Sequence, residues 1–233
     1  MNNFTPNFPL YAQIVKGEKR EKFELFYSLL ISFNKKYNLT AITEEEEVFH
    51  KHFLDSVAGE MWIKKGANVL EVGSGAGFPS LPLKIMRDDL QFTLVESTGK
   101  KCDFLKTAVE KLDLTGVRVE NARAEELAKK ENYRESFDVC CARAVARLNV
   151  LAEYCLPFVK KGGMFLAYKG DAEEEVREAK RALSVLGGGE AQTHSYELPN
   201  GYGSRTLVLV KKIKNTPPAY PRGQGKERKN PLV

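Results

Sequence analysis

The chain has 233 residues, of which 42% are hydrophobic, and a formal net charge of +5 at pH 7. It is long enough to bury one substantial core, and its size suits a single α/β domain with an appendage. No apolar run approaches the roughly 20 residues that a membrane helix requires, and the start lacks the basic, apolar and small-residue order of a signal peptide, so we expect a cytoplasmic protein with no membrane partner.

The first 60 residues have a helical pattern, and we expect them to form an N-terminal extension. From residue 18 to about 38, apolar residues recur at spacings of three and four, which is typical of an amphipathic helix. A second helix is expected after residues 43–46, where a threonine and three glutamates suit a capped helix start. His50 and His52 follow, but residues two apart on a helix do not share a face, so we predict no metal site.

After Gly66 the pattern changes to short apolar runs that alternate with amphipathic ones. The expected strands are ANVLEV, FTLVES, VRVENA, FDVCCA and GMFLAY, and the expected helices between them include KKCDFLKTAVEKL and DAEEEVREAKRAL. Asp171 and Glu174 form a capping pair for the second of these helices, and Gly187 to Gly189 end it. This alternation predicts a doubly wound, mainly parallel sheet over residues 61–214.

The last two predicted strands of this region have no helix between them. QTHSYEL and RTLVLVKKI are joined by PNGYGS, a turn-rich linker that contains Asn-Gly. We therefore expect a C-terminal antiparallel hairpin.

A glycine-rich stretch, NVLEVGSGAGFPSLPL at residues 68–83, follows the first predicted strand of the α/β unit and opens a helix. Ligands of open parallel sheets bind beyond the carboxyl ends of the strands, where the strand order reverses, so Gly73, Gly75 and Gly77 should lie at a binding crevice. A dinucleotide fingerprint requires a small residue at position 78, where this chain has Phe78. Glu96, at the end of the next strand, can accept hydrogen bonds from both ribose hydroxyls. Together these residues predict a nucleoside-cofactor site.

A G-x-G-x-G loop after an acid-ended strand, here Glu71, resembles the S-adenosylmethionine site of class I methyltransferases; some relatives carry Asp in place of Glu71, and we expect either acid to be tolerated. The wider chain resembles the bacterial ribosomal RNA small subunit methyltransferase G family, also called glucose-inhibited division protein B. The segments that carry this resemblance span nearly the whole chain and are FNKKYNLTAI, HKHFLDS, VLEVGSGAGFPSLPLKI, ARAVARL, AYKG and YPRGQGKERKNPL. Membership would imply a Rossmann-like fold and methyl transfer from S-adenosyl-L-methionine to N7 of one guanine in a decoding-region hairpin of 16S ribosomal RNA, free or in the small ribosomal subunit.

The resemblance also implies cofactor contacts at Gly73, Phe78, Glu96, Ala124, Glu125 and Arg143. Gly73 would allow close backbone approach, Phe78 would offer an apolar surface and Glu96 would hold the ribose. Ala124 and Glu125 match the place where the family contacts the adenine end. Arg143 would pair with the cofactor carboxylate or face the RNA, and both alternatives stay open. We expect no proton-transfer residue, because guanine N7 carries a free lone pair and no proton.

Other reactive side chains fit a less specific interpretation. Lys169 ends a predicted strand beside the crevice, and it is either a substrate contact or an exposed lysine. Cys140 and Cys141 suggest a nucleophile for cytosine methylation, but they lie within an apolar run, so we expect core residues. With no CxxC pair, all four cysteines should be reduced and mostly buried. No NPPY-like stretch follows this strand, which favours N7 over an exocyclic amine.

The basic character of the chain is concentrated at its end. Residues 211–233 carry a net charge of +6, which leaves −1 for the rest of the chain. Charge alone fits a frayed, solvated tail as well as a phosphate contact, and the family's shared YPR ending favours phosphate contact for the basic tail, residues 215–233. Neutralising Lys226, Arg228 and Lys229 is then expected to weaken RNA binding and to leave cofactor affinity unchanged.

Three other functions compete with RNA methylation. The first is a small-molecule methyltransferase, which would be insensitive to loss of the basic tail. The second is an NAD-dependent oxidoreductase, which Phe78 disfavours. The third is an RNA-binding factor without catalysis, which the intact GSGAGFP loop and Glu96 disfavour.

Overall fold

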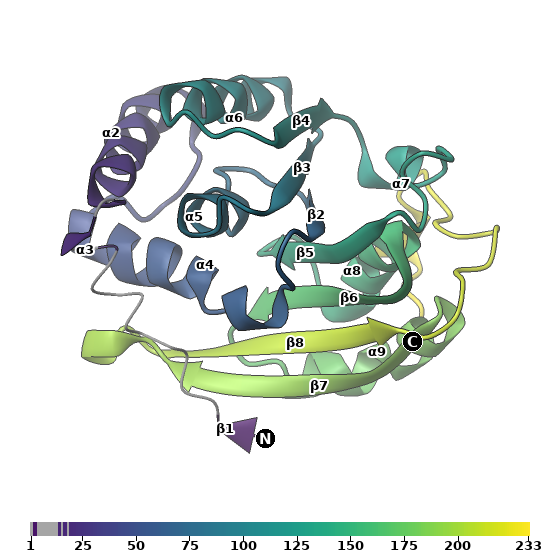
Figure 1. The fold of residues 1–233 in the computed structure, drawn as a ribbon. Coiled ribbons are helices and arrows are strands. Elements are labelled where there is room, and N and C mark those ends of the chain that lie inside the picture. Colours follow the sequence, from purple (N-terminus) through teal and green to yellow (C-terminus); the bar gives the residue numbers. More distant parts are fainter. Residues whose placement is uncertain (1, 4–13, 15, 18) are drawn as a thin grey trace.

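The computed structural model describes residues 2–3, 14, 16–17 and 19–233, and Figure 1 shows a central twisted sheet with helices on both faces. The strands are β1 (Asn2–Asn3), β2 (Asn68–Val72), β3 (Gln91–Glu96), β4 (Val117–Asn121), β5 (Phe137–Arg143), β6 (Val159–Lys169), β7 (Gly188–Glu197) and β8 (Ser204–Lys212). The α-helices are α2 (Arg20–Tyr37), α3 (Glu45–Val48), α4 (Asp55–Val57), α5 (Ser80–Met86), α6 (Gly99–Lys111), α7 (Ala124–Leu127), α8 (Leu148–Cys155), α9 (Glu173–Val185) and α10 (Lys226–Lys229). A π-helix, Phe49–Leu54, joins α3 to α4, and short 3-10 turns cover Glu60–Trp62, Leu156–Phe158 and Pro199–Gly201.

The strand order is β1-β7-β8-β6-β5-β2-β3-β4. The pairs between β4, β3, β2, β5 and β6 are parallel, whereas β8 is antiparallel to both β6 and β7. The predicted α/β class, the parallel sheet and the C-terminal hairpin are therefore confirmed. The order reverses at β2, which lies between β3 and β5, and this point is where a doubly wound sheet offers a ligand crevice.

Two hydrophobic clusters fill the two faces of the sheet. One cluster joins α2, the π-helix, α5 and α6 to the sheet, and the other joins α7, α8 and α9 to the opposite face. Cys140 belongs to the second cluster and Cys141 to the first, as expected for neighbours in a strand. All four cysteines are free and buried, which confirms the prediction of core thiols.

The N-terminal extension differs in detail from its prediction. Its main helix, α2, lies where the apolar spacing placed it and buries Phe23, Phe26 and Leu30. The following helix starts at Glu45 without a side-chain cap, so the expected capped start is wrong. β1 is extended rather than helical, because it pairs with His194 and Ser195 of β7. The rest of residues 1–18, which the predicted helical pattern of the first 60 residues included, lies largely outside the described residues.

The end of α9 follows its sequence signal, whereas the predicted Asp171–Glu174 capping pair at its start is wrong. Asp171 Oδ1 accepts a hydrogen bond from Glu173 N at 3.1 Å, although the helix itself begins after Ala172 and carries no side-chain cap at that residue. Gly187, with φ of +84°, ends it in the left-handed region that glycine adopts without steric cost. Among the described helices, none is long and apolar enough to cross a membrane.

Candidate functional site

A crevice lies at the carboxyl ends of the strands, at the point where the strand order reverses. Its lining residues are Val72, Gly73, Val95, Ser97, Ala122, Arg123, Ala124, Glu125, Val145, Tyr154 and Arg228. Gly73, Ala124 and Glu125 are therefore brought together as predicted. The enclosed volume is ≈ 100 Å³, which is below the roughly 300 Å³ of a small-molecule pocket, so a nucleoside ligand would also extend across the open mouth.

The glycine loop between β2 and α5 is shaped by positive φ angles and by bonds to β3. Gly73, Gly75 and Gly77 have φ of +71°, +52° and +83°. These angles lie in the left-handed region, where a residue with a side chain is strained. The N–H groups of Gly73 and Ser74 both donate to the Val95 carbonyl, at 2.8 and 3.2 Å. A Cβ at Gly73 would lie 2.7 Å from Val145 Cγ2, so the loop packs closely against the segment after β5 and only glycine fits.

Glu96 supports this loop from the end of β3. Its carboxylate is 6% exposed and accepts hydrogen bonds from Gly75 N at 3.0 Å and from Thr98 N at 2.8 Å, one on each oxygen. Each carboxylate oxygen has a second lone-pair position, so Glu96 can still accept two hydroxyl groups. The residues present therefore fit a nucleoside ligand: a glycine cradle that a Cβ would fill, and a carboxylate fixed beside it.

Ala124 and Glu125 form the first turn of α7, directly after β4. Ala124 is buried and Glu125 is partly exposed, and both line the crevice. The small side chain of Ala124 leaves space at this wall.

Phe78 occupies a different environment from the one expected. Its ring is 6% exposed and lies 5.3 Å from Phe26, 6.0 Å from Phe53 and 4.5 Å from His52, measured between ring centroids. It does not line the crevice and instead joins the glycine loop to the N-terminal helices. The sequence pattern missed this role because the ring's partners lie about 25 to 50 positions away in the chain.

Arg143, at the end of β5, also faces the N-terminal extension. It donates to Asp55 Oδ2 at 3.0 Å, to the Lys51 carbonyl at 3.1 Å and to His52 Nδ1 at 2.9 Å, and its guanidinium lies 4.9 Å from the Phe78 ring centroid. Both members of the Arg143–Asp55 pair are largely buried. Tyr196 on β7 donates to the other Asp55 oxygen at 2.5 Å. This network links the π-helix, β5 and the hairpin. The sequence analysis did not predict that Asp55 and Tyr196 belong to it.

His52 is surrounded by hydrogen-bonding groups of this network. Its Nδ1 lies 2.9 Å from Arg143 Nη2, which can only donate, and 3.1 Å from the Lys51 carbonyl, which can only accept, and its Nε2 lies 2.8 Å from Thr40 Oγ1. Burial, reinforced by the charge of Arg143, lowers the pKa of His52 to about 3. His50 instead stacks on Tyr202 at 4.4 Å between ring centroids. The two histidines thus have separate surroundings.

Glu71 lies at the end of β2, behind the glycine loop. Its side chain is fully buried, and the Ser80 and Ser74 groups near its carboxylate only partly offset the effect of that burial on its pKa. Burial raises the pKa of Glu71 to about 8. At neutral pH this acid is therefore mainly protonated.

Lys169 is not the exposed lysine that was one of its two expectations, and it does not line the crevice. Its ammonium pairs with Glu175 of α9 at 2.7 Å and donates to the Ala146 carbonyl at 2.7 Å. Its side chain is only 10% exposed. Lys169 therefore fixes the loop after β5 to α9.

A larger groove, of ≈ 600 Å³, lies at the opposite end of the strands, where their amino ends are. Its lining includes Ala67, Val139 and Met164 near the amino ends of β2, β5 and the parallel part of β6. Parallel sheets do not bind their ligands at this edge. The crevice at the glycine loop is therefore the candidate site, although it is the smaller of the two.

Comparison with known proteins agrees with this geometry. The family described as rRNA small subunit methyltransferase G matches residues 19–206. A protein of Lactobacillus acidophilus named ribosomal RNA small subunit methyltransferase G is 49% identical over 224 residues, which cover 94% of this chain and 93% of that protein. A protein of the same name from Staphylococcus aureus is 47% identical over 218 residues, which cover 92% of this chain and 91% of that protein.

Solved structures share the fold at low sequence identity. A predicted O-methyltransferase from Agrobacterium tumefaciens aligns with a TM-score of 0.56 and 17% identity over 70% of this chain and 81% of its own. A SAM-dependent O-methyltransferase from Thermotoga maritima aligns with a TM-score of 0.52 and 14% identity over 81% of this chain and 73% of its own. These likenesses concern the fold alone.

Proposed function

Because the chain belongs to the rRNA small subunit methyltransferase G family, we propose that it transfers a methyl group from S-adenosyl-L-methionine to N7 of one guanine in 16S ribosomal RNA. The observation that carries this proposal is the glycine cradle at the switch point of the sheet, with Glu96 fixed beside it. The names of the two relatives describe them as methyltransferases of small-subunit ribosomal RNA. We further propose that this methyl transfer takes place in the cytoplasm, on the RNA or on the assembling small subunit.

The residues divide the binding task as follows. The backbone at Gly73, which lines the crevice, admits the ligand, and Glu96, which holds Gly75 N of the same loop, accepts hydrogen bonds from the ribose hydroxyls. Ala124 and Glu125 form the wall at the adenine end. Phe78 acts from behind the glycine loop, which it anchors to the N-terminal helices through its ring. Arg143 holds the methionine end or the RNA, through the donors that its contacts with residues 51–55 leave free.

Catalysis by this site rests on position rather than on proton transfer. When bound, S-adenosyl-L-methionine supplies a methyl group on a positively charged sulfur. Guanine N7 has a free lone pair, so no side chain has to remove a proton. The protein's contribution is to align N7 with the methyl group and the departing sulfur. Residues 1–60 then act as an extension beside the site, residues 61–214 as the methyltransferase domain, and residues 215–233 as a basic C-terminal element.

The test supplies purified protein with methyl-labelled S-adenosyl-L-methionine and, in parallel, small subunits from cells that lack the activity, or naked 16S RNA. We expect label in the RNA of at least one of the two substrates. Binding of S-adenosyl-L-methionine without label in either RNA would favour a small-molecule methyltransferase. Saturable binding of NAD without binding of S-adenosyl-L-methionine would establish an oxidoreductase instead.

A further inference from the structure

The C-terminal strap, residues 215–233, is fixed to the domain beside the crevice. Arg222 donates to both carboxylate oxygens of Glu153 on α8, with Nη2 at 2.7 Å from Oε2, and Glu153 is 1% exposed. Arg134 donates to the carbonyls of Tyr220 at 2.9 Å and Thr216 at 2.8 Å. In Figure 1 this segment runs along the side of the molecule, past α7 and back towards α9. A frayed tail would have none of these contacts.

The last turn of the strap reaches the crevice that holds Gly73. In α10, Arg228 lines this crevice together with Tyr154, and its Nη2 donates to the Val145 carbonyl at 3.3 Å. Val145 is also the residue whose side chain lies 2.7 Å from the position of a Cβ at Gly73. Arg228 therefore stands at the same opening as the glycine cradle, on the side contributed by the C-terminus.

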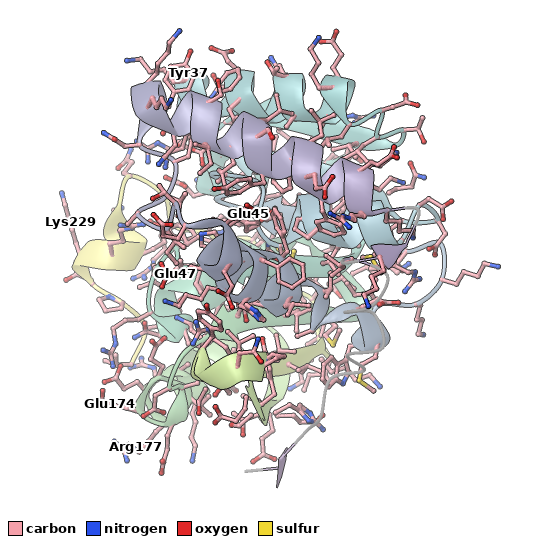
Figure 2. The ribbon with its side chains drawn as sticks, turned by 90° about the vertical axis from the view of Figure 1, so that its left-hand side faces the viewer. Tyr37, Glu45, Glu47, Glu174, Arg177 and Lys229 are labelled. Atoms are coloured by element: carbon pink, nitrogen blue, oxygen red, sulfur yellow. The ribbon has the colours of Figure 1, made fainter. Side chains whose placement is uncertain are left out.

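The cations of α10 are not equivalent. Glu227 is completely buried and accepts a hydrogen bond from Gly223 N, which fixes the orientation of this turn. Lys226, Arg228 and Lys229 are all exposed, but of the three only Arg228 lines the crevice, and Figure 2 shows Lys229 extending away from the body of the molecule. One turn thus directs an arginine towards the crevice and lysines towards solvent.

We propose that Arg228 is a cofactor-binding residue, so that the C-terminal strap forms one wall of the cofactor site. Because the enclosed crevice is small, a nucleoside has to lie across its open mouth, where Arg228 is placed. A guanidinium is planar, stacks on aromatic faces and donates to oxygen acceptors, so it suits the adenine and ribose that Ala124, Glu125 and Glu96 flank. The identity of the nucleoside rests on the proposed function, whereas the wall itself rests on the contacts of the strap.

The test measures the dissociation constant of S-adenosylhomocysteine, the product form of the cofactor, by calorimetry. We expect Arg228→Ala to weaken binding roughly tenfold, in the range of a lost stacking or cation–π contact. Lys229→Ala, in the same turn and with the same loss of charge, should leave the constant unchanged within about twofold. Arg228→Lys should recover only part of the loss, because an ammonium lacks the planar fork.

A second variant tests the strap as a unit. Arg222→Met removes the ion pair with Glu153, and we expect it to weaken binding as Arg228→Ala does. Adding Arg228→Ala to Arg222→Met should then cost little more. Thermal unfolding followed by circular dichroism shows whether each variant is folded.

Equal constants for Arg228→Ala and wild type in folded protein would overturn the proposal, as would equal losses in Arg228→Ala and Lys229→Ala. A wild-type protein that binds S-adenosylhomocysteine but labels no ribosomal RNA would contradict the proposed substrate alone and leave this comparison intact. Absence of binding in the wild type would overturn both proposals.

Discussion

At the scale of single residues, two glycines with the same backbone conformation have different surroundings. Gly66 and Gly73 have φ of +69° and +71°. A Cβ at Gly66 would meet no atom within 4 Å, whereas one at Gly73 would meet Val145 at 2.7 Å. Only Gly73 is therefore required for close approach as well as for its conformation.

This contrast gives a controlled test of the glycine cradle. Gly66→Ala should lose about 1–2 kcal/mol of unfolding free energy, because it places a side chain in the left-handed region, and Gly73→Ala should lose about 1–3 kcal/mol more, because its methyl group also collides with Val145. Only Gly73→Ala should weaken S-adenosylhomocysteine binding, by roughly tenfold, since the methyl group displaces Val145 and fills the mouth. Chemical denaturation and calorimetry measure the two effects. Unchanged binding in a folded Gly73→Ala protein would remove the cradle from the site.

Glu71 predicts a pH dependence of stability. Its pKa is raised from 4.5 to about 8 by burial, so between these values the unfolded chain loses the proton and the folded chain keeps it. Stability from this residue is complete below pH 4.5 and is lost as the pH rises towards 8. The free energy of unfolding, measured in urea, should therefore fall less between pH 5 and pH 8 for Glu71→Gln than for the wild-type protein. Parallel curves for the two proteins would show that Glu71 is ionised in the folded state.

At the scale of elements, the π-helix connects the N-terminal extension to the carboxyl end of β5. π-Helical turns are rare in proteins, and those that occur are often found at functional sites. This one places the Lys51 carbonyl and His52 against Arg143. Asp55, directly after it, neutralises the guanidinium and accepts from Tyr196 of the hairpin. Three regions far apart in sequence are thus joined at one buried carboxylate.

Removing that carboxylate's charge should be costly. Asp55→Asn leaves the Arg143 cation largely buried without its counter-ion, and we expect a loss of about 3 kcal/mol in unfolding free energy. Glu24→Gln removes one partner of the exposed Arg20–Glu24 pair and should change stability by less than about 0.5 kcal/mol. Equal urea midpoints for Asp55→Asn and Glu24→Gln would contradict the network.

The outward lysines of α10 are the part of the strap that suits phosphate contact. We expect Lys226→Gln with Lys229→Gln to weaken RNA binding and to make its salt dependence shallower by about one unit of log–log slope per lost contact. Lys65→Gln with Lys111→Gln, exposed at the opposite edge of the sheet, is the matched control. Filter binding over a range of salt concentrations measures the slopes, and identical slopes would refute a phosphate role. Arg228 was grouped with these lysines in the sequence-based expectation that cofactor affinity would not change, but it lines the crevice and is therefore left intact here.

At the scale of the whole molecule, the sequence predicted those features that depend on local pattern. Strand and helix alternation predicted the parallel sheet, and the Asn-Gly linker predicted the hairpin. The glycine loop after the first strand of the α/β unit and Glu96 at the end of the next strand were located because strand ends and tight turns have local signals, and Gly73 of this loop lines the crevice. The contacts of Phe78, Arg143, Lys169 and Arg228 had no such signals.

Those contacts depend on tertiary packing between distant segments. The guanidinium of Arg143 meets Asp55, 88 positions earlier, and Arg228 meets the Val145 carbonyl, 83 positions earlier. A net charge of +6 in residues 211–233 also does not reveal that Lys212 is fully buried against Glu135, or that Arg222 pairs with Glu153. Charge counting therefore treated this segment as one basic tail. In the structure, some of its cations form buried ion pairs, one lines the crevice and others extend into solvent.

The measurement that tests the central claim most directly is the chemical identity and position of the methylated nucleotide. Ribosomal RNA from small subunits, methylated by the purified protein, would be digested and analysed by mass spectrometry. We predict 7-methylguanosine at a single site in 16S RNA and no other new methylated nucleotide. Methylation of an exocyclic amine, of cytosine, or of many guanines would contradict a site that works by aligning one N7 with the methyl group.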